Sequence, residues 1–436
     1  MAIPATHDDP LILSGTALLV NSDQLVPNGA LAMARGTIQG VGTRDQILRQ
    51  FSGVPEVHAA GCILSPGFVN AHTHLELTYI AGTIPGQTSF PDWVLRLIEH
   101  YPEPADAQRV FTASALRGAQ ESLFFGVTTV GDITRRPSIV RTALQLHSAL
   151  RVVSFGEIAA LGKLRGQLDE RLTAALTPPA GAARMRIGLS PHAPYSVEGP
   201  VLETIARAAR NYKLPLCMHL AELREEKEFL TDFSGPLGKE WSLMQRLNLL
   251  DDLIPAFAEG PIRWAEHYGL FSAGVPVILA HVNYADDAEI DLLARCGAAV
   301  AYCPRTRDYF GHDAITPHRW RDMRAHGIRV CLATDSKASN PDLSPLREAQ
   351  CVLQRDPTAD PQNLMAMITT EPAIALGLKN NLGQLATGFS ADVIAIPVPA
   401  NMALNAARIC DYLVRHAPQP SQVWVGGQSA LDRQTM

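Results

Sequence analysis

The segments ILSPGFVNAHTH (residues 63–74) and IRVCLATDS (residues 328–336) decide the fold, because each runs from apolar residues directly into histidine or carboxylate. Six more β-branched and apolar runs lie between them, separated by stretches with helical spacing. The candidate strands are 63–74, 127–133, 151–158, 185–193, 214–222, 275–282, 298–304 and 328–336. Eight such units predict an α/β fold, a (β/α)8 TIM-like barrel, with functional side chains at the C-terminal strand ends.

The two terminal regions have a different pattern from the predicted barrel. Residues 11–62 and the stretch after Gly383 contain short apolar runs, such as ADVIAIPVP, broken by turn-forming residues. We therefore expect residues 1–62 and 384–436 to pair as one composite β-sandwich domain. Residues 63–383 would then form the barrel, with enough chain to bury a large core.

The composition of the 436 residues excludes several classes of protein. A net charge of −6 gives no sign of a basic surface, so we expect a small-molecule substrate and no nucleic acid. The seven cysteines are scattered singly, which argues against a disulfide framework. The apolar run from Leu11 to Val20 follows acidic residues, so we expect no membrane partner and a cytoplasmic location. A homodimer is expected from symmetry alone.

Four polar residues at predicted strand ends have the chemistry of metal ligands. His72 and His74 alternate along the first strand, so both imidazoles project from one face. His219 ends the fifth strand and Asp335 ends the eighth. Imidazole and carboxylate suit zinc or ferrous iron, and such a set with a position left for water is typical of catalytic sites. A bound ion lowers the pKa of water and so supplies a nucleophile near neutral pH.

Two further residues near these ligands are candidates for catalysis, together with Asp335 as a base. Glu222 follows His219 by three residues and is placed to carry protons from the attacking water to the leaving nitrogen. The alternative for Glu222 is a solvated carboxylate at the start of a helix. His281 ends the sixth strand, where it either orients the attacking water or acts as a further metal ligand.

Candidate substrate contacts besides Glu222 lie around the barrel mouth. His192, in SPHAPYS, faces the mouth or is a loop histidine bonded to backbone. Phe90 and Trp93 follow the first strand, and they either stack on a flat base and close the pocket or belong to a helix core.

The motifs PGFVNAHTHLEL, GVTTVGDI, SPHAPYS, MHLAE, ILAHV and LATDSKASN resemble those of the amidohydrolase superfamily, specifically its cytosine-deaminase-like branch. The resemblance spans nearly the whole chain and implies a metal-dependent amidohydrolase. It implies His72, His74, His219 and Asp335 as metal ligands. SPHAPYS contains no lysine to bridge a second ion, so the resemblance implies one divalent metal ion, zinc first and iron as the alternative.

Within that branch, HTHLEL, FPDWV, HLAELREEKEFL and CPRTRDYFGH look most like aminodeoxyfutalosine deaminases of menaquinone biosynthesis. SPHAPYS is also similar to methylthioadenosine and S-adenosylhomocysteine deaminases. These resemblances imply hydrolytic loss of ammonia from an adenine-containing nucleoside, with aminodeoxyfutalosine as the leading substrate. One alternative is a relative that cleaves another C–N or C–Cl bond, in a guanine-type, triazine-type or formimino substrate. Another is a non-catalytic binding barrel, against which the complete set of polar residues argues.

Two segments depart from the pattern that this resemblance leads us to expect. Thr306 and Arg307 stand where serine and histidine are commoner, and Lys337 follows Asp335 where an apolar residue is commoner. Arg305, Arg307 and Lys337 could bind a substrate carboxylate as charged donors, or they could be ordinary surface charges.

Overall fold

The computed structural model describes residues 9–181 and 184–432. Eight parallel strands form a nearly closed barrel with the order β13-β12-β11-β10-β9-β8-β7-β6, so every strand pairs with its neighbour in the chain. The strands are β6 (Phe68–Thr73), β7 (Val127–Thr134), β8 (Arg151–Ile158), β9 (Met185–Pro191), β10 (Leu216–Leu220), β11 (Val277–His281), β12 (Ala299–Tyr302) and β13 (Arg329–Leu332). The expected (β/α)8 architecture is confirmed.

The first and last barrel strands meet through side chains as well as backbone. The Asn70 side-chain amide donates to Thr334 Oγ1 at 2.7 Å, and the Thr334 backbone N–H donates to Asn70 Oδ1 at 3.2 Å. The Asp335 N–H donates to the His72 carbonyl oxygen at 3.1 Å. Two candidate metal ligands, far apart in sequence, are therefore fixed side by side where the barrel closes.

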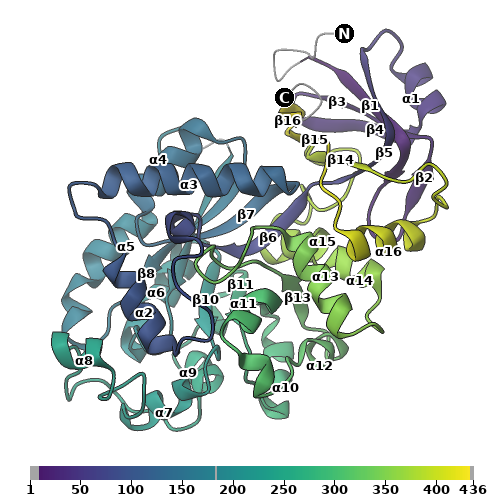
Figure 1. Ribbon diagram of the computed structural model, residues 1–436. Coiled ribbons are helices and arrows are strands. Elements are labelled where there is room, and N and C mark those ends of the chain that lie inside the picture. Colours follow the sequence, from purple (N-terminus) through teal and green to yellow (C-terminus); the bar gives the residue numbers. More distant parts are fainter. Residues whose placement is uncertain (1–8, 182–183, 433–436) are drawn as a thin grey trace.

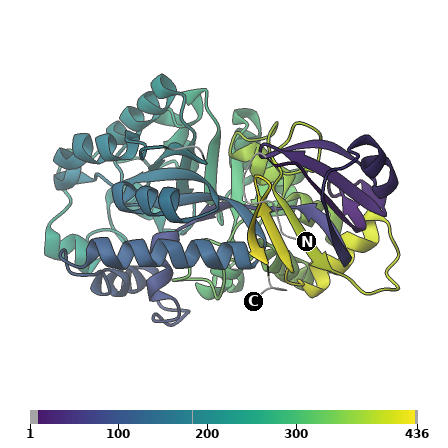
Figure 2. The same ribbon diagram turned by 90° about the horizontal axis from the view of Figure 1, so that it is seen from above.

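The two ends of the chain form a separate mixed sheet beside the barrel. Its order is β16-β15-β14-β5-β1-β3-β4, and β2 pairs with β1. Figure 1 shows the purple N-terminal and yellow C-terminal strands together at one side of the molecule, and Figure 2 shows the same grouping from above. The strands are β1 (Leu11–Leu19), β2 (Leu25–Pro27), β3 (Gly29–Ala34), β4 (Thr37–Thr43), β5 (Glu56–Pro66), β14 (Val393–Pro397), β15 (Gln422–Val425) and β16 (Gln428–Asp432).

The single strand expected over residues 63–74 is wrong, because the structure divides it at Gly67. Before Gly67 the chain pairs with β14 in the terminal sheet, and after it the chain pairs with β7 in the barrel. The Gly67 N–H donates to the Asp392 carbonyl oxygen at 3.1 Å. A Cβ at Gly67 would lie 2.2 Å from Thr128 Oγ1, so only glycine allows this close crossing.

Helices cover the outer face of the barrel, and several begin at strong capping residues. Asp286 and Glu289 form a capping box at α10, which ends at Gly297 in the left-handed conformation. The α-helices are α1 (Arg44–Gln50), α2 (Phe90–Glu99), α3 (Ala107–Phe124), α4 (Pro137–His147), α5 (Leu168–Leu176), α6 (Gly199–Tyr212), α7 (Glu225–Asp232), α8 (Ser242–Leu247), α9 (Pro261–His267), α10 (Asp287–Cys296), α11 (Pro304–Tyr309), α12 (Trp320–Ala325), α13 (Pro345–Arg355), α14 (Pro361–Ala366), α15 (Thr370–Ala375) and α16 (Ala406–His416). Short 3-10 helices are η1 (Leu75–Ile80), η2 (Gly162–Gln167), η3 (Phe271–Ala273) and η4 (His312–Ala314).

Side-chain alternation along β10 shows how the barrel positions polar groups. Cys217 packs with apolar residues of other barrel strands, such as Val69 and Ile278, whereas Met218 and Leu220 belong to a separate apolar cluster. His219 shares the inward face of Cys217 because successive strand residues point to opposite sides. None of the helices in residues 9–181 and 184–432 is both long and apolar enough to cross a membrane.

Candidate metal centre

A cavity with about 560 Å³ of empty space opens at the C-terminal ends of the barrel strands. This is the end at which (β/α)8 enzymes carry their active sites. The cavity is lined by His74, Glu76, Leu77, Phe90, Trp93, Leu97, Tyr101, Arg135, Glu157, His192, Tyr195, His219, Glu222, His281, Phe310, Asp335 and Ser336.

Three histidines converge at the floor of this cavity. One ring nitrogen from each of His72, His74 and His219 lies within 4.8 Å of the others, and all three side chains are buried. His74 Nε2 and His219 Nε2 are 3.2 Å apart. Asp335 Oδ1 lies 3.6 Å from His72 Nε2 and 3.4 Å from His74 Nε2. The structure therefore brings the four expected metal ligands together.

The donor atoms at the floor fit a single divalent ion. His72 Nε2 is buried and has no hydrogen-bond partner among the described residues, which is costly unless a ligand occupies that direction. Burial lowers the pKa of His72 well below its usual value and lowers the pKa of His74 to about 3. Neutral imidazole is the form of histidine that binds metal ions, and three imidazoles with one carboxylate suit zinc or iron.

Neighbouring groups hold the candidate ligands in the orientation that faces this point. His219 Nδ1 donates to the His192 carbonyl oxygen at 3.1 Å, which leaves Nε2 as the free nitrogen on the cavity side. Ser339 Oγ donates to Asp335 Oδ2 at 2.9 Å, so Oδ1 remains for the histidine side. Such contacts fix the tautomer and the rotamer of metal-binding side chains.

The backbone at three of these strand ends adopts conformations that non-glycine residues rarely take. Ala221 has φ 50°, His281 has φ 74°, Val282 has φ 48° and Asp335 has φ 56°. Each residue lies at or just beyond the last residue of its strand. Positive φ values of this kind cost free energy and are tolerated where surrounding contacts fix the chain, commonly at functional sites.

Glu222 lies in the cavity wall next to the histidines. Its side chain is buried, and Oε1 is 3.6 Å from His281 Nε2. The carboxylate of Glu226 accepts the backbone N–H groups of residues 221–223, which tightens the loop that carries Glu222. Burial, then the charges of Asp335 and Glu226, raise the pKa of Glu222 well above its usual value. The alternative interpretation of Glu222 as a solvated helix-start carboxylate is wrong, because α7 begins later, at Glu225.

His281 stands beside the three-histidine group without belonging to it. Its ring centre lies 5.6 Å from those of His72 and His219. The His281 carbonyl oxygen accepts a hydrogen bond from His318 Nε2 at 2.9 Å. His318 is buried and stacks on Tyr302 with ring centres 3.9 Å apart. This position favours the water-orienting alternative for His281 over the ligand alternative.

Aromatic side chains form the wall opposite the polar floor. Phe90 and Trp93 lie on α2 and stack on each other with ring centres 5.9 Å apart. Phe310 contacts both rings, at 5.5 Å from Phe90 and 5.3 Å from Trp93. Phe90 also meets Tyr195 edge-on at 5.7 Å. Phe90 and Trp93 therefore do both things that the sequence left open: they pack in a small apolar core, and they line the cavity.

His192 lines the cavity, as one of its two alternatives requires. Its Nδ1 is 2.6 Å from Ser196 Oγ, so the ring is also held by its own loop. Its ring centre lies 5.1 Å from that of His219 and 5.7 Å from that of Tyr195. His192 thus stands between the metal centre and the aromatic wall.

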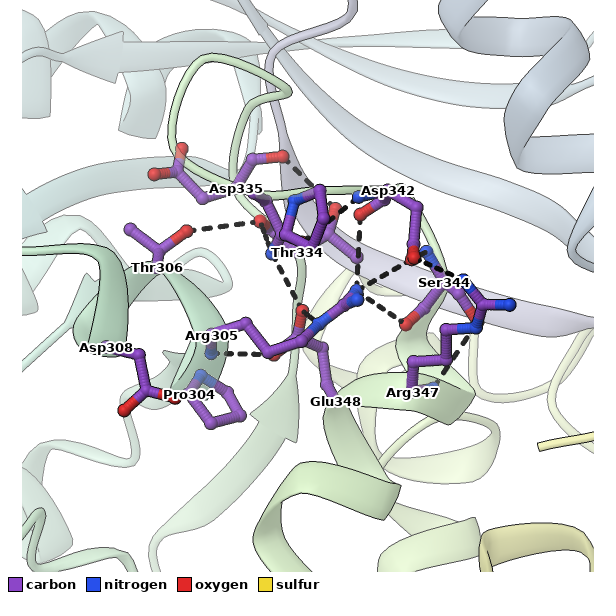
Figure 3. A network of polar contacts seen from close by, with 12 residues as sticks. Pro304, Arg305, Thr306, Asp308, Thr334, Asp335, Asp342, Ser344, Arg347 and Glu348 are labelled. Atoms are coloured by element: carbon purple, nitrogen blue, oxygen red, sulfur yellow. Dashed lines mark hydrogen bonds and ion pairs between the residues drawn. The ribbon is translucent and has the colours of Figure 1, made fainter. Parts of the chain in front are cut away.

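Arg305 does not line the cavity, although its sequence position had made it a candidate for substrate binding. Its Nε donates to Glu348 Oε1 at 2.7 Å, and its Nη2 donates to Asp342 Oδ1 at 2.8 Å. Figure 3 shows the guanidinium turned towards Glu348, Asp342 and Ser344. Arg305 is therefore paired with two carboxylates in a buried network behind the candidate metal centre.

The other two candidate cations are also paired inside the protein. Arg307 is 1% exposed and forms an ion pair with Asp313. Lys337 Nζ lies 2.9 Å from Glu121 Oε1. Thr306 is buried, with Oγ1 3.2 Å from Ser339 Oγ. Arg307, Lys337 and Thr306, which depart from the expected pattern, therefore each contact another side chain of the protein.

The network around Arg305 reaches the metal side through Asp335. The Asn340 side-chain amide donates to the Thr334 carbonyl oxygen at 2.7 Å and to Glu348 Oε1 at 2.8 Å. Thr334 precedes Asp335 directly, and Ser339 bonds the Asp335 carboxylate. The chain that carries Asp335 is therefore held from behind by a continuous set of buried polar contacts.

Several residues that line the cavity were not predicted from the sequence. Glu76 is buried and accepts from Thr134 Oγ1 at 2.5 Å, and Arg135 Nε lies 2.9 Å from Glu157 Oε1. The strand-end rule could have found two of them, since Arg135 directly follows β7 and Glu157 is the penultimate residue of β8. Tyr101 lies outside the strands and gave no such signal.

Comparison with known proteins agrees with this architecture. The amidohydrolase family pattern matches residues 63–428. A 5-methylthioadenosine/S-adenosylhomocysteine deaminase of Desulforudis audaxviator is 27% identical over 95% of this chain and 91% of its own. An aminodeoxyfutalosine deaminase of Deinococcus radiodurans is 30% identical over 77% of this chain and 78% of its own. The fold resembles a zinc-bound adenosine deaminase from Xanthomonas campestris, with a TM-score of 0.79 at 20% identity over 98% of this chain and 94% of that one. The chain belongs to the amidohydrolase family and is a hydrolytic enzyme that acts on carbon–nitrogen bonds.

Proposed function

We propose that this protein is a metal-dependent deaminase that removes ammonia from the adenine ring of a nucleoside. The observation that carries the proposal is the position of buried Glu222 beside the three-histidine group, in a cavity with an aromatic wall. The names of the relatives from Desulforudis and Deinococcus support the choice of an adenine nucleoside. Aminodeoxyfutalosine is the leading substrate, and a menaquinone route would then be the pathway served.

In this proposal His72, His74, His219 and Asp335 hold one divalent ion, zinc first and iron as the alternative. When bound, the ion supplies Lewis-acid activation of water at neutral pH. The segment SPHAPYS at the end of β9 contains no lysine that could bridge a second ion, so we propose a single ion.

The proton transfers fall to Glu222, whose pKa is raised by burial and by the charges of Asp335 and Glu226, so that it holds a proton more readily than an exposed carboxylate does. Glu222 accepts a proton from the attacking water, delivers it to the ring nitrogen, and assists departure of the amine. Its neighbour His281 orients the water, with Nε2 3.6 Å from Glu222 Oε1. Asp335 assists as ligand and base.

The cavity wall supports a flat heteroaromatic substrate. Phe90 and Trp93 line one side of it, and stacking of a substrate ring on one of them would add about 0.5–1.5 kcal/mol beyond the burial of apolar area. His192, between the floor and the aromatic wall, is placed to bond the base or the sugar. Closure of this wall over the base would exclude bulk water from the reacting atoms.

The proposal is tested by ammonia release from a purine panel, using protein whose metal content has been measured. The panel contains aminodeoxyfutalosine, methylthioadenosine, S-adenosylhomocysteine, adenosine, guanine and 8-oxoguanine. Fast release from one or more adenine nucleosides, with none from the guanines, is the expected result. Metal-loaded protein that releases ammonia from none of the adenine compounds would overturn the proposal and direct the search to triazine-type or formimino substrates.

A further inference from the structure

A second cavity opens at the other end of the barrel from the metal centre, where the barrel meets the terminal sheet. Its lining includes the starts of β8 and β9, Thr129 near the start of β7, and the turn from β3 into β4. Residues 378–382, Gly388 and Ser390 contribute the rest. This cavity shares no lining residue with the catalytic cavity, so it is a separate site.

The charge of this second cavity is strongly positive, although the whole chain has a net charge of −6. Four arginines line it, and no aspartate or glutamate of the described residues does so. Arg151 is neutralised by Asp392, with Nε 2.9 Å from Oδ2. In residues 9–181 and 184–432, the other three arginines, Arg35, Arg184 and Arg186, form no ion pair. The lining therefore carries three positive charges that no carboxylate of the described chain compensates.

Strand register places part of this lining on the inner face of the barrel. Thr129 pairs with Arg151, and Val153 pairs with Arg186. Paired residues of neighbouring strands point to the same face, as do residues two apart on one strand. Val153 packs in one apolar cluster with residues of most other barrel strands, which only the barrel interior allows. Thr129, Arg151 and Arg186 therefore line the N-terminal mouth of the barrel. The Val152 N–H donates to the Arg184 carbonyl oxygen at 3.0 Å, which places Arg184 beside them.

Most N–H groups of these unpaired arginines remain available to a ligand. Arg184 Nη2 donates to the Ser148 carbonyl oxygen at 3.1 Å, and Arg186 Nη1 donates to the Gly377 carbonyl oxygen at 3.3 Å. A guanidinium has five N–H donors, so these contacts orient the two side chains without using up their donors. Arg184 is half-buried, whereas Arg35 and Arg186 are exposed at the rim.

A buried hydroxyl in the same lining also lacks a partner. Thr129 is 0% exposed, and its Oγ1 has no hydrogen-bond partner among the described residues. A buried hydroxyl without a partner costs free energy, and a ligand in the cavity that Thr129 lines would remove this cost. Phosphate oxygens accept hydrogen bonds from hydroxyl groups and from guanidinium groups, the latter often in pairs. Charged and neutral donors are thus gathered in one cavity without an acceptor that carries charge.

We propose that this cavity is a second, non-catalytic binding site, which takes a small molecule that carries a phosphate group. Arg184, Arg186 and Thr129 bind the phosphate oxygens, and Arg35 closes the site from the terminal sheet. Three uncompensated positive charges favour a doubly charged phosphate over a carboxylate. Because the arginines come from both the barrel and the terminal sheet, the ligand joins these two parts, and its binding stabilises the folded protein. The site lies outside the catalytic cavity and binds its ligand whatever the substrate is.

The test titrates metal-loaded protein with inorganic phosphate, ribose 5-phosphate or succinate at constant ionic strength, and follows both the heat of binding and the thermal midpoint. At least one phosphate compound should bind with a Kd of about 1 mM or tighter, and more tightly than succinate. The tighter of the two identifies the ligand as free phosphate or as a sugar phosphate. In Arg184→Gln and Arg186→Gln this Kd should rise about 10-fold. Arg117→Gln removes the same charge from an exposed position on α3 outside the cavity, and it should keep the wild-type Kd.

Thr129→Val separates the binding of phosphate from the folding of the chain. Valine keeps nearly the shape of threonine but has no hydroxyl, so the unliganded variant should be at least as stable as wild type. Its Kd for phosphate should nevertheless rise, because one donor to the ligand is lost. A lower thermal midpoint of the unliganded variant would show that the hydroxyl has a partner within the protein, and would remove Thr129 from the site.

Three results would overturn the proposed site. Neither phosphate compound binding at concentrations up to about 10 mM would exclude it. Tighter binding of succinate than of both phosphate compounds would contradict the phosphate assignment. An unchanged phosphate Kd in both Arg184→Gln and Arg186→Gln would show that the anion binds elsewhere, for example at the catalytic ion. Because Arg186 is exposed, its substitution should not disturb folding, and the thermal midpoint of each unliganded variant checks this.

Discussion

Asp335 has two sides with opposite chemistry. On the cavity side, Oδ1 faces His72 and His74 at 3.6 and 3.4 Å, and His72 Nε2 has no hydrogen-bond partner among the described residues. On the rear side, Ser339 bonds Oδ2, and the chain continues into a network in which Arg305 is paired twice (Figure 3). The cavity side contains a buried ring nitrogen of His72 without a hydrogen-bond partner, whereas the charges of Arg305 on the rear side are paired.

This difference shows how a reactive site is kept in shape. Side chains that point at an ion or a substrate do not hold one another in position, so contacts on their other sides must fix their orientation. The buried rear network supplies those contacts, and it also holds Asp335 at its positive φ of 56°. Changes on the cavity side should therefore affect chemistry first, and changes on the rear side should affect stability first.

The largest effect is expected from the cavity side. Asp335→Ala removes one of the proposed ligands, so metal content should fall and kcat should drop by at least ~10⁴-fold, because water activation is lost. Elemental analysis together with ammonia release checks both quantities. Asp106→Ala, at an exposed position, is the control and should retain metal and turnover. Full activity of Asp335→Ala would remove Asp335 from the metal centre.

Glu222→Gln should separate metal binding from proton transfer. The amide keeps the size and the burial of the side chain but cannot accept or deliver the proton, so kcat should fall by roughly 10²–10⁴-fold. Metal content should stay at the wild-type level, because Glu222 lies beyond the four proposed ligands. Elemental analysis and steady-state kinetics give the two readings. Near-normal turnover would exclude Glu222 from the mechanism.

A substitution on the rear side of Asp335 should lower stability first and activity second. Arg305→Met leaves Glu348 buried without its cation, which should lower the free energy of unfolding by about 3–5 kcal/mol. Because Asp335 then loses support, metal affinity or activity should fall by about 10–100-fold. Urea unfolding and metal titration measure these changes.

A double variant sharpens the comparison. Arg305→Met with Glu348→Leu removes both charges, so stability should return towards the wild-type value while activity stays reduced. If the single variant Arg305→Met were as stable and as active as wild type, the rear network would have no role in holding Asp335.

The sequence predicted the cavity side well and the rear side poorly, for a physical reason. The positions of His72, His74 and His219 follow from strand geometry, because a residue near the end of a parallel strand lies at the mouth of the barrel whatever its partners are. Arg305 also lies near a strand end, but a long flexible cation goes to whichever carboxylates the tertiary fold brings close. Here those are Asp342 and Glu348, which lie about 40 residues further along the chain.

The division of the first predicted strand at Gly67 has a similar cause. The apolar pattern over residues 63–74 is continuous, and it is the partner strand that changes, from β14 to β7. Periodicity reports that a segment is extended and buried but does not report which sheet it joins.

The smallest expected effect concerns His318, which supports His281 from behind. Its Nε2 bonds the His281 carbonyl oxygen at 2.9 Å, and its Nδ1 is buried with no partner in the described structure. Burial lowers the pKa of His318 to about 3. The folded protein therefore keeps His318 neutral while the unfolded chain takes up a proton below about pH 6.5, so stability is full above that pH and declines as the pH falls towards 3.

His318→Gln keeps a hydrogen-bond donor but removes this titration. Between pH 7.0 and 5.5, wild type should lose about 1 kcal/mol more of its free energy of unfolding than the variant does, as the difference in pKa requires. Urea unfolding at the two pH values measures the loss. Tyr302→Phe keeps both the stacked ring and His318, so it should show the wild-type loss. Equal losses in wild type and His318→Gln would mean that His318 takes up a proton in the folded protein as readily as in the unfolded chain, which would contradict the lowered pKa.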